Sequence, residues 1–479
     1  MGDSPHTPSI HILDDDSLLN IFHLYRPAVF DGDEHDDHRL FGGKKWYRER
    51  WWYQLVHVCQ RWRDLIFRSA SHLDLCLVCT FGTPITDMLA NSPPFPLIID
   101  YPGQDHPIAA ECENEIIFAL EQHHERVRRI RLFVPTPNIE RLITVIEGEY
   151  PILEYLILAT PIEDKSTGLM LTETFHAPHL RHLQLTGIAI PIGSRLLTTA
   201  VGLIVLALNM KHPSGYLQPN TLLQWISFMP ELEMLAVFFG FPVLSRDVER
   251  QLMRAPITTH VTLPNLLGLT FRGASAYMEA FVPHITTSRL EKCQIALPNQ
   301  LTISIPRLLQ FINTTENLRF NRAAFLFYDE RVTVGVYPDE NAKAYSLSLV
   351  VDCWHLDWQV SSAVQISNAL SQKFSAVVYL TFGHEEHSRS SGERNEVDRN
   401  EWRKLLMSFN NVKTLDIRDY GLVGEFSHCL QLDDGEHPLE LLPELQELIF
   451  LECTAVGDAF AKFIDARKNA GRPVTLTRR

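Results

Sequence analysis

A short apolar pattern recurs along most of this chain and restricts the folds that it can adopt. Five segments begin with proline and carry apolar residues two, five and seven positions later. They start at Pro151, Pro178, Pro230, Pro264 and Pro443. Copies without the proline start at Val127, Val201, Leu290, Phe320, Ala344, Val377 and Val412, so the period is about 30 residues. A repeat of this period predicts a solenoid, in which each unit packs on its neighbours.

Within a copy, apolar residues alternate with polar or small residues, which predicts a strand. The segments that follow, such as NTLLQWISFM and NEWRKLLMSF, suit a helix. This order of strand, turn and helix resembles the leucine-rich-repeat family over roughly residues 120 to 460. The Asn or Cys that the family places after its last apolar position is present at Asn209 and Cys453 and missing from most copies. The resemblance therefore implies an α/β fold with an irregular solenoid.

A solenoid of this kind would line its concave side with parallel strands and offer an extended surface to a partner. The positions between the buried apolar residues would face that partner. The candidate partner-binding residues are Glu154, His182, Gln184, Glu233, Thr270, Lys413, Asp416 and Arg418. Each of them is also compatible with an ordinary solvent-facing residue of a strand.

Two amphipathic segments precede the solenoid. In ILDDDSLLNIFHLY, the residues Leu18, Ile21, Phe22 and Tyr25 trace one helical face, and the aspartates before them can cap the helix. In the second segment Trp52, Leu55, Cys59, Trp62 and Ile66 step by three and four, which predicts a second helix. Cys59 then lies in an apolar stripe, and His57 points to another side of that helix. This spacing favours packing or docking over a reactive Cys/His pair.

These two segments resemble the F-box family, with an L-D-x-D-x-L-x-x-I-F start and an L-V-x-V-C-x-x-W-R finish. The resemblance implies a small helical unit that docks on a Skp-type adaptor and, through it, on a cullin. The adaptor-binding residues that it implies are Leu13, Leu18, Ile21, Phe22, Leu55, Val58, Cys59, Trp62 and Arg63. The chain departs from the family where Asp14 replaces the common proline, and where a long insertion separates the two segments.

These features predict a division of the chain into four parts. An F-box-like helical domain would span 8–72, with an inserted acidic and basic loop at about 26–50. A connecting region would follow at 73–119, the irregular solenoid at 120–465 and a basic tail at 466–479.

The composition narrows the classes of partner. Asp and Glu number 58 against 43 Lys and Arg, and a net charge of −15 disfavours binding to nucleic acid. The longest apolar run, Leu196 to Met210, is shorter than the ~20 residues of a membrane span and predicts buried core. No secretory signal is evident, and the eight cysteines form no framework, so we expect free thiols and a location in the cytoplasm or nucleus.

Three segments carry metal-binding or redox residue types in spacings that favour a simpler interpretation. Cys76 and Cys79 form CLVC inside an apolar run, which predicts core packing. His35 and His38 lie in DGDEHDDHR, and His384 and His387 lie in HEEHSRSSGERN; both segments are polar and predict loops. We therefore expect no metal and no cofactor. Phosphate-binding loops and nucleophile elbows are also missing, so we expect no enzyme activity, although a hydrolase or metal enzyme built from distant residues stays open.

The function expected from these resemblances is that of a substrate receptor in a Skp-cullin-F-box ubiquitin ligase. The helical unit would bind the adaptor, the solenoid would bind a protein substrate, and catalysis would reside in the recruited ligase. The alternative is an intracellular leucine-rich-repeat scaffold that acts without a ligase. The two differ in whether the first hundred residues bind the adaptor.

Overall fold

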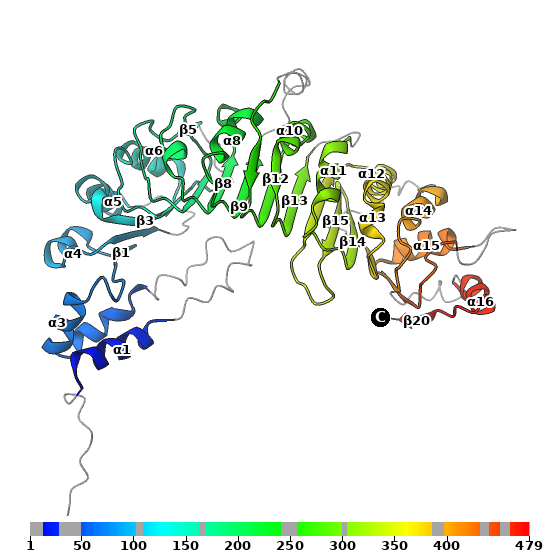
Figure 1. Ribbon diagram of the computed structural model, residues 1–479, viewed down its shortest axis with the longest axis horizontal. Helices are drawn as coiled ribbons and strands as arrows, with labels where there is room; N and C mark the ends of the chain where they lie inside the picture. The colour runs from blue at the N-terminus through cyan, green and yellow to red at the C-terminus, as the bar shows by residue number, and fades with distance from the viewer. Residues whose placement is uncertain are drawn as a thin grey trace, which may run out of the picture. The chain divides into compact units, whose positions relative to one another are not determined.

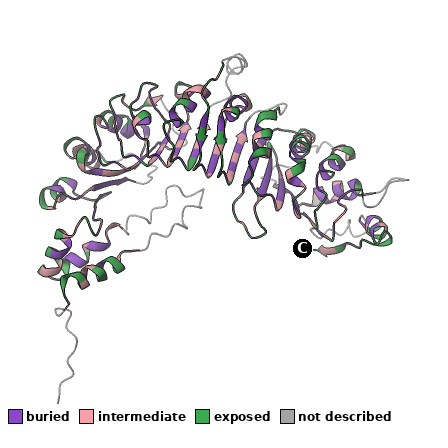
Figure 2. Ribbon diagram, in the orientation of Figure 1, coloured by how far each residue is buried: buried purple, intermediate pink, exposed green. Residues whose placement is uncertain are grey.

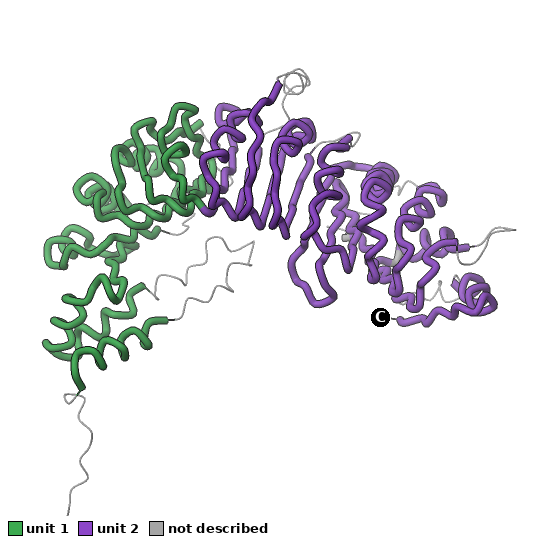
Figure 3. Tube along the Cα trace, viewed as in Figure 1, with its two compact units in different colours: residues 1–203 green, residues 204–479 purple. Residues whose placement is uncertain are grey.

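A computed structural model describes residues 13–27, 49–101, 109–161, 168–240, 256–298, 304–385, 397–431, 440–450 and 460–478. In these residues, 16 strands form a mostly parallel sheet and alternate with helices, which confirms the predicted α/β class and is consistent with a leucine-rich-repeat-like solenoid. The chain divides into two compact units, residues 1–203 and 204–479 (Figure 3).

Unit 1 begins with a small group of helices. They are α1 (Asp15–Tyr25), the 3-10 turns η3 (Trp51–Tyr53) and η4 (Leu55–His57), and α3 (Gln60–Arg68). The Asp14 carboxylate accepts a hydrogen bond from the Ser17 amide at 2.7 Å, so an aspartate caps α1 as the sequence predicts.

The rest of unit 1 contains five parallel strands in the order β1-β2-β3-β4-β6, joined mainly through helices. The strands are β1 (Leu77–Cys79), β2 (Leu97–Tyr101), β3 (Val127–Phe133), β4 (Tyr155–Ala159) and β6 (His182–Thr186). The helices are α4 (Ile85–Asn91), α5 (Ala110–Gln122), η5 (His124–Arg126), α6 (Thr136–Val145) and α7 (Leu196–Thr199), and a small second sheet pairs β5 (Leu169–Met170) with β7 (Ile188–Ala189).

Unit 2 carries eleven strands of the main sheet, in the order β8-β9-β11-β13-β16-β15-β14-β17-β18-β19-β20. The strands are β8 (Val205–Met210), β9 (Met234–Phe239), β11 (Gly268–Arg272), β13 (Lys292–Leu297), β14 (Arg322–Tyr328), β15 (Arg331–Tyr337), β16 (Leu347–Asp352), β17 (Tyr379–Glu385), β18 (Thr414–Ile417), β19 (Glu447–Phe450) and β20 (Thr475–Arg478). A separate pair joins β10 (Val261–Leu263) and β12 (Ile285–Thr287).

The helices of unit 2 include α8, α10, α11 and α12, which lie along one side of its sheet (Figure 1). The full set is η6 (Pro213–Gly215), α8 (Pro219–Ile226), α10 (Ser275–Phe281), η7 (Val282–His284), α11 (Pro306–Thr314), α12 (Leu356–Ala369), α13 (Ser371–Phe374), α14 (Arg399–Leu406), α15 (Tyr420–Cys429) and α16 (Ala461–Asn469). Pro219 and Pro306 begin α8 and α11, where a proline removes no intrahelical hydrogen bond.

One strand, β15, interrupts the parallel order of unit 2. β15 pairs antiparallel with both β14 and β16, while β13 pairs with β16 and β14 pairs with β17 in parallel. Because only two residues separate β14 from β15, these strands form a hairpin, which is necessarily antiparallel. The repeat pattern did not predict this insertion.

Buried and more exposed residues alternate along β8, β9 and β13 of unit 2 (Figure 2). In β8, for example, Leu206, Leu208 and Met210 are buried and the residues between them are partly exposed. The buried positions face the helices: the rings of Phe327 and Trp402 meet at 5.5 Å, from β14 and α14. We call the other side of the sheet, which carries the alternate residues, the open face.

The strands confirm the predicted repeat. In all five copies that begin with proline, the strand starts four residues after the proline. The three apolar positions of each copy are buried, as Leu153, Leu156 and Leu158 show with 0% exposure. The copies that start at Val127, Val201, Leu290, Phe320, Ala344, Val377 and Val412 also contain strands.

The sheet extends beyond the predicted limits of the solenoid, 120–465, at both ends. β1 and β2 lie in the segment 73–119 that was expected to connect two domains, and β20 lies in the expected tail 466–479. These strands have only three to five residues. Backbone hydrogen bonds to a neighbouring strand hold such short strands, and these bonds leave little trace in the side-chain pattern.

Candidate interaction surfaces

The N-terminal helices of unit 1 enclose a small apolar core. Leu18 and Phe22 from α1 and Ile66 from α3 are 0% exposed. The rings of Phe22 and Trp62 meet edge to face, with centroids 4.8 Å apart. Three of the predicted adaptor-binding residues, Leu18, Phe22 and Leu55, are therefore buried in this core and are not available to a partner.

The predicted helix through Trp52 and Ile66 is wrong in its first half. Two 3-10 turns span this half, and Cys59 adopts an extended conformation at the N-cap of α3. The Trp52 indole donates to the Cys76 carbonyl at 3.3 Å, and an Arg50 amino group donates to the Val78 carbonyl at 3.1 Å. These bonds tie the segment to β1 and its approach, so tertiary contacts override the helical periodicity.

Four large apolar side chains remain exposed on the same helical group. They are Leu24 at 84%, Val58 at 56%, Tyr25 at 53% and Ile21 at 42%, and we call them the apolar patch. Ile21, Leu24 and Tyr25 are neighbours on α1 by their spacing of three and four. The Tyr25 hydroxyl lies 3.5 Å from Gln54 Oε1, so Gln54, four residues before Val58, lies beside α1.

Two of the predicted adaptor-binding residues lie in the apolar patch, and the prediction that they bind an adaptor stays untested. They are Ile21 and Val58, whereas Leu24 and Tyr25 were not among the predicted residues. Of the other predicted residues, Leu13, Cys59 and Trp62 are partly exposed, and Arg63 is exposed with its Nε bound to the Val56 carbonyl at 3.0 Å. The signal for Leu24 was present in the sequence, because a leucine outside the apolar stripe of a helix has no core to enter.

A cluster of charged groups fastens the helical group to the first strands of unit 1. The Asp74 carboxylate pairs with Arg26, at the end of α1, and with Arg128 in β3. Arg128 also pairs with Glu154 at 3.0 Å, and Arg129 pairs with Glu49 at 2.8 Å. Burial would raise the pKa of the Asp74 carboxyl, but the hydrogen bonds and charges of Arg128 and Arg26 outweigh it and lower that pKa below 3.8.

Cys76 and Cys79 are buried free thiols, as the sequence predicts. Burial raises the pKa of Cys76 to about 11 and that of Cys79 to about 12. Thiols with such pKa values are poor metal ligands and poor nucleophiles. Within the described parts of the chain, no group of His, Cys, Asp and Glu side chains has the arrangement of a metal site. His35, His38 and His387 lie outside the described residues.

Three of the predicted partner-binding residues lie in unit 1. His182 and Gln184 occupy alternate positions of β6 and are partly exposed, and the His182 ring lies 4.9 Å from the Tyr155 ring. Glu154 is partly exposed and engaged by Arg128. His182 and Gln184 therefore lie on one face of the strand, as the alternation predicted, and Glu154 has a structural partner.

The remaining five predicted residues lie in unit 2. Glu233 and Lys413 are exposed just before β9 and β18, and Thr270 is partly exposed on the open face in β11. Asp416 is only 1% exposed, because it accepts hydrogen bonds from the Tyr379 hydroxyl and from Arg418 Nε, both at 2.9 Å. Asp416 is thus enclosed by its partners, while Arg418 remains exposed.

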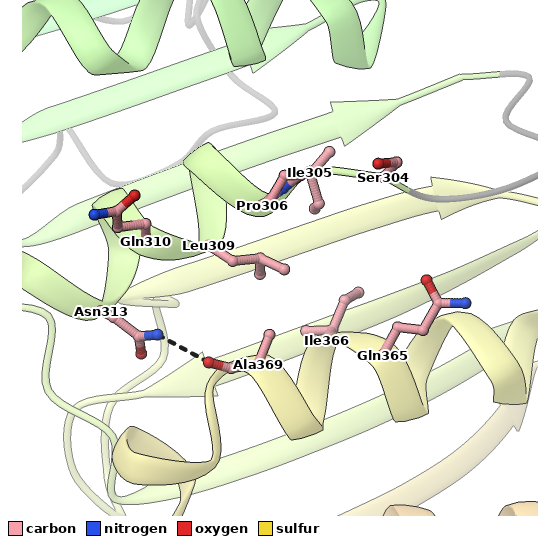
Figure 4. A pocket seen from close by; sticks show the side chains of 9 residues that line it. All are labelled: Ser304, Ile305, Pro306, Leu309, Gln310, Asn313, Gln365, Ile366 and Ala369. Atoms are coloured by element: carbon pink, nitrogen blue, oxygen red, sulfur yellow. Dashed lines mark hydrogen bonds between the residues drawn. The ribbon is translucent and has the colours of Figure 1, made fainter.

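A depression of about 480 Å³ lies between α11 and α12 on the helical side of unit 2 (Figure 4). Ile305, Leu309 and Ile366 supply apolar walls, and the Asn313 side chain donates to the Ala369 carbonyl at 2.8 Å. None of its nine lining residues is titratable.

The function of this chain is inferred from its fold and its surfaces. No protein-family model matches this chain, and no curated protein matches it. In the portions that the structure describes, no helix is long and apolar enough to cross a membrane. The fold defines an α/β protein whose mostly parallel sheet resembles a leucine-rich-repeat solenoid, preceded by a helical group with an exposed apolar patch.

Proposed function

We propose that this protein is a substrate receptor of a Skp-cullin-F-box ubiquitin ligase. The N-terminal helical group would dock on a Skp-type adaptor, and the open face of the sheet would bind a protein to be ubiquitinated. The observation that carries the proposal is the apolar patch, since 84% exposure of Leu24 and 56% exposure of Val58 leave large apolar side chains in water. Clustered exposed apolar residues are typical of a protein interface.

The division of apolar residues within the helical group supports docking over simple packing. Leu18, Phe22 and Ile66 already form a closed core, so the group does not need Leu24 or Val58 for its own stability. Burial of a leucine or valine side chain in an interface contributes about 1.5–3 kcal/mol. A partner that covered the whole patch would therefore gain a substantial part of its binding free energy from four residues.

The attachment of the helical group to the sheet supports a receptor that holds two partners. Asp74 connects Arg26 of the helical group with Arg128 of β3, and Trp52 reaches the Cys76 carbonyl. These contacts lie within unit 1 and limit the motion of the helical group relative to β1 and β3. A receptor that presents a substrate to a recruited enzyme acts through proximity, and a fixed attachment favours that action.

The test is capture of a purified Skp-type adaptor by the full-length chain and by a Leu24→Asp, Val58→Asp variant. Both substitutions are at exposed positions, so the fold should survive, whereas substitution of the buried Leu55 would disturb the core. An Ile192→Asp variant is the matched control, because Ile192 is 78% exposed in unit 1 and lies outside the apolar patch.

We expect the parent and the Ile192→Asp control to capture the adaptor and the double variant to lose it. Equal capture by all three proteins would exclude the apolar patch as the docking surface. A folded parent that captures no adaptor would contradict the ligase proposal and leave the ligase-independent scaffold.

A further inference from the structure

An arginine on the open face of unit 2 is held between two aromatic rings. Arg322 is the first residue of β14, and its neighbours across the sheet are Tyr337 in β15 and Tyr379 in β17. Its guanidinium carbon lies 4.8 Å from the Tyr337 ring centroid and 5.4 Å from that of Tyr379. Buried Ala323 and Phe325 alternate with Arg322 along the strand, so the Arg322 side chain points away from the helices.

The charge of Arg322 has no carboxylate partner among the residues that the structure describes. Its Nε is buried and makes no hydrogen bond. The residue as a whole is partly exposed, so its terminal amino groups stay reachable from solvent. Two other arginines differ, because Arg131 in β3 of unit 1 pairs with Asp100 and Arg418 in unit 2 pairs with Asp416. A guanidinium that is partly desolvated and unpaired costs stability, and an anionic ligand would remove that cost.

The surroundings of Arg322 extend this site into an aromatic surface. The Tyr345 ring lies 4.6 Å from the Tyr337 ring and covers Gly335, where an added Cβ would clash with the Tyr345 ring. Tyr337, Tyr345 and Tyr379 are all partly exposed. The Tyr379 hydroxyl is fixed by Asp416, which holds that ring beside Arg322. Tyrosine and arginine dominate the energetic centres of protein interfaces, because rigid rings and a planar guanidinium lose little entropy on binding.

The chemistry of the site selects a carboxylate. A single planar guanidinium matches a carboxylate through two parallel hydrogen bonds. A phosphate group carries nearly two negative charges and calls for more donors than this one arginine supplies. A nucleic-acid strand would meet a chain of net charge −15. The tyrosine rings favour apolar or aromatic neighbours beside the carboxylate.

We propose that Arg322, Tyr337 and Tyr379 bind an aspartate or glutamate side chain of a protein partner, flanked by apolar residues. This inference rests on the proposed function in one respect, since it names the chemistry of the substrate that the receptor would hold. The side chain would pair with the Arg322 amino groups, and its neighbours would pack on Tyr337 and Tyr345.

The experiment selects a displayed library of random peptides on the immobilised full-length chain and then measures synthetic copies of the enriched peptides in solution. We expect an enriched acidic residue next to apolar ones. Replacing that residue by its amide should weaken binding to the parent by about 10-fold to 100-fold. The Arg322→Gln substitution should weaken binding of the acidic peptide to a similar degree. It should leave the affinity of the amide peptide unchanged, because both changes remove the same ion pair.

Two further variants separate the site from general effects on the surface. Arg331→Gln is the matched control, since the Arg331 guanidinium carbon also lies over a tyrosine ring of the open face, 4.7 Å from the centroid of Tyr328. This variant should bind the peptides as tightly as the parent does. Gly335→Ala should displace the Tyr345 ring without touching Arg322 and weaken binding by a smaller factor. Circular dichroism of each variant checks that it is folded.

The proposal is overturned if enriched peptides lack an acidic residue, if nothing is enriched over the Arg322→Gln chain, or if phosphoserine copies bind more tightly than the carboxylate peptides. Adaptor capture, measured on the same proteins, distinguishes this proposal from the previous one. Arg322→Gln should retain adaptor capture. Peptide binding without adaptor capture in the parent would support the anion site and contradict the ligase function.

Discussion

Arg131 in β3 and Asp100 in β2 face each other on neighbouring strands and form two parallel hydrogen bonds. The Arg131 Nε lies 2.6 Å from one carboxylate oxygen of Asp100, and an amino group lies 2.7 Å from the other. Their side chains are only 14% and 6% exposed. The pair therefore neutralises two charges at a place where neither is well solvated, and each residue depends on the other.

Removal of one partner should destabilise unit 1 more than removal of both. Asp100→Ala leaves the Arg131 charge without compensation and should cost about 3–5 kcal/mol, whereas an Asp100→Leu, Arg131→Met double variant should recover most of that loss. Chemical unfolding of the three proteins measures the difference. A double variant that is less stable than Asp100→Ala would contradict this interpretation.

The contact between Phe22 and Trp62 predicts how the helical group responds to truncation. Phe22 is fully buried, so Phe22→Ala should cost about 3–5 kcal/mol by loss of burial and creation of a cavity. Leu24→Ala, at a neighbouring exposed position, should change stability by less than about 0.5 kcal/mol. Hydrogen exchange of the amides in α1 and α3 measures both effects locally. Similar protection in the two variants would show that the group has no independent core.

The Asp74 cluster predicts a dependence of stability on pH. Because Arg128 and Arg26 hold the pKa of Asp74 below 3.8, ionised Asp74 stabilises the fold above the pKa of the unfolded chain. That contribution is lost as the pH falls through the lowered pKa. Asp74→Asn should therefore reduce stability by about 1 kcal/mol at neutral pH and by much less near pH 3.

Asparagine is the suitable replacement for Asp74, since this residue has a φ of 51°, which asparagine tolerates better than most residues. The fluorescence of the tryptophans in the helical group during urea unfolding measures the loss of stability at neutral pH and near pH 3. A loss of stability that is equal at neutral and acid pH would assign the effect to shape instead of charge.

The buried thiols predict slow chemical modification. With pKa values of about 11 and about 12, Cys76 and Cys79 carry less than about one thiolate in a thousand at neutral pH. Iodoacetamide should therefore label the partly exposed Cys59 and Cys112 of the native chain well before these two. Mass analysis of peptides gives the order in which the cysteines are labelled. Unfolding in urea should abolish that order. Rapid native labelling of Cys76 or Cys79 would contradict the burial that raises their pKa.

The repeat and the first helix were predictable because their signals are local and redundant. Leu183 and Leu185 occupy the same positions in their copy as Leu235 and Val237 do in another, and all four are buried in strands. A spacing of this kind is fixed by the two-residue period of a strand, whatever the neighbours are. The same holds for Asp14, which caps α1 through an amide only three residues away.

The exposed apolar residues of α1 were harder to predict because one periodic stripe can face either a core or the surface. The sequence places Leu18 and Ile21 in one stripe, yet the fold buries the first and leaves the second 42% exposed. The helix predicted through Cys59 does not form in its first half, because Trp52 and Arg50 donate hydrogen bonds to distant carbonyls that set the path of the backbone. Contacts of this kind are absent from any local pattern.

The sequence by itself determined that this chain alternates strands and helices, where the strands of the repeat lie and which apolar positions of each proline-led copy are buried. Side-chain alternation and period are local properties, and burial of apolar residues enforces them. Only the tertiary structure decided that β14 and β15 form an antiparallel hairpin and that this hairpin brings Tyr337 beside Arg322, with Tyr379 on the other side. The order of strands across a sheet depends on pairing between distant segments, and such pairing decides which side chains meet to form a site.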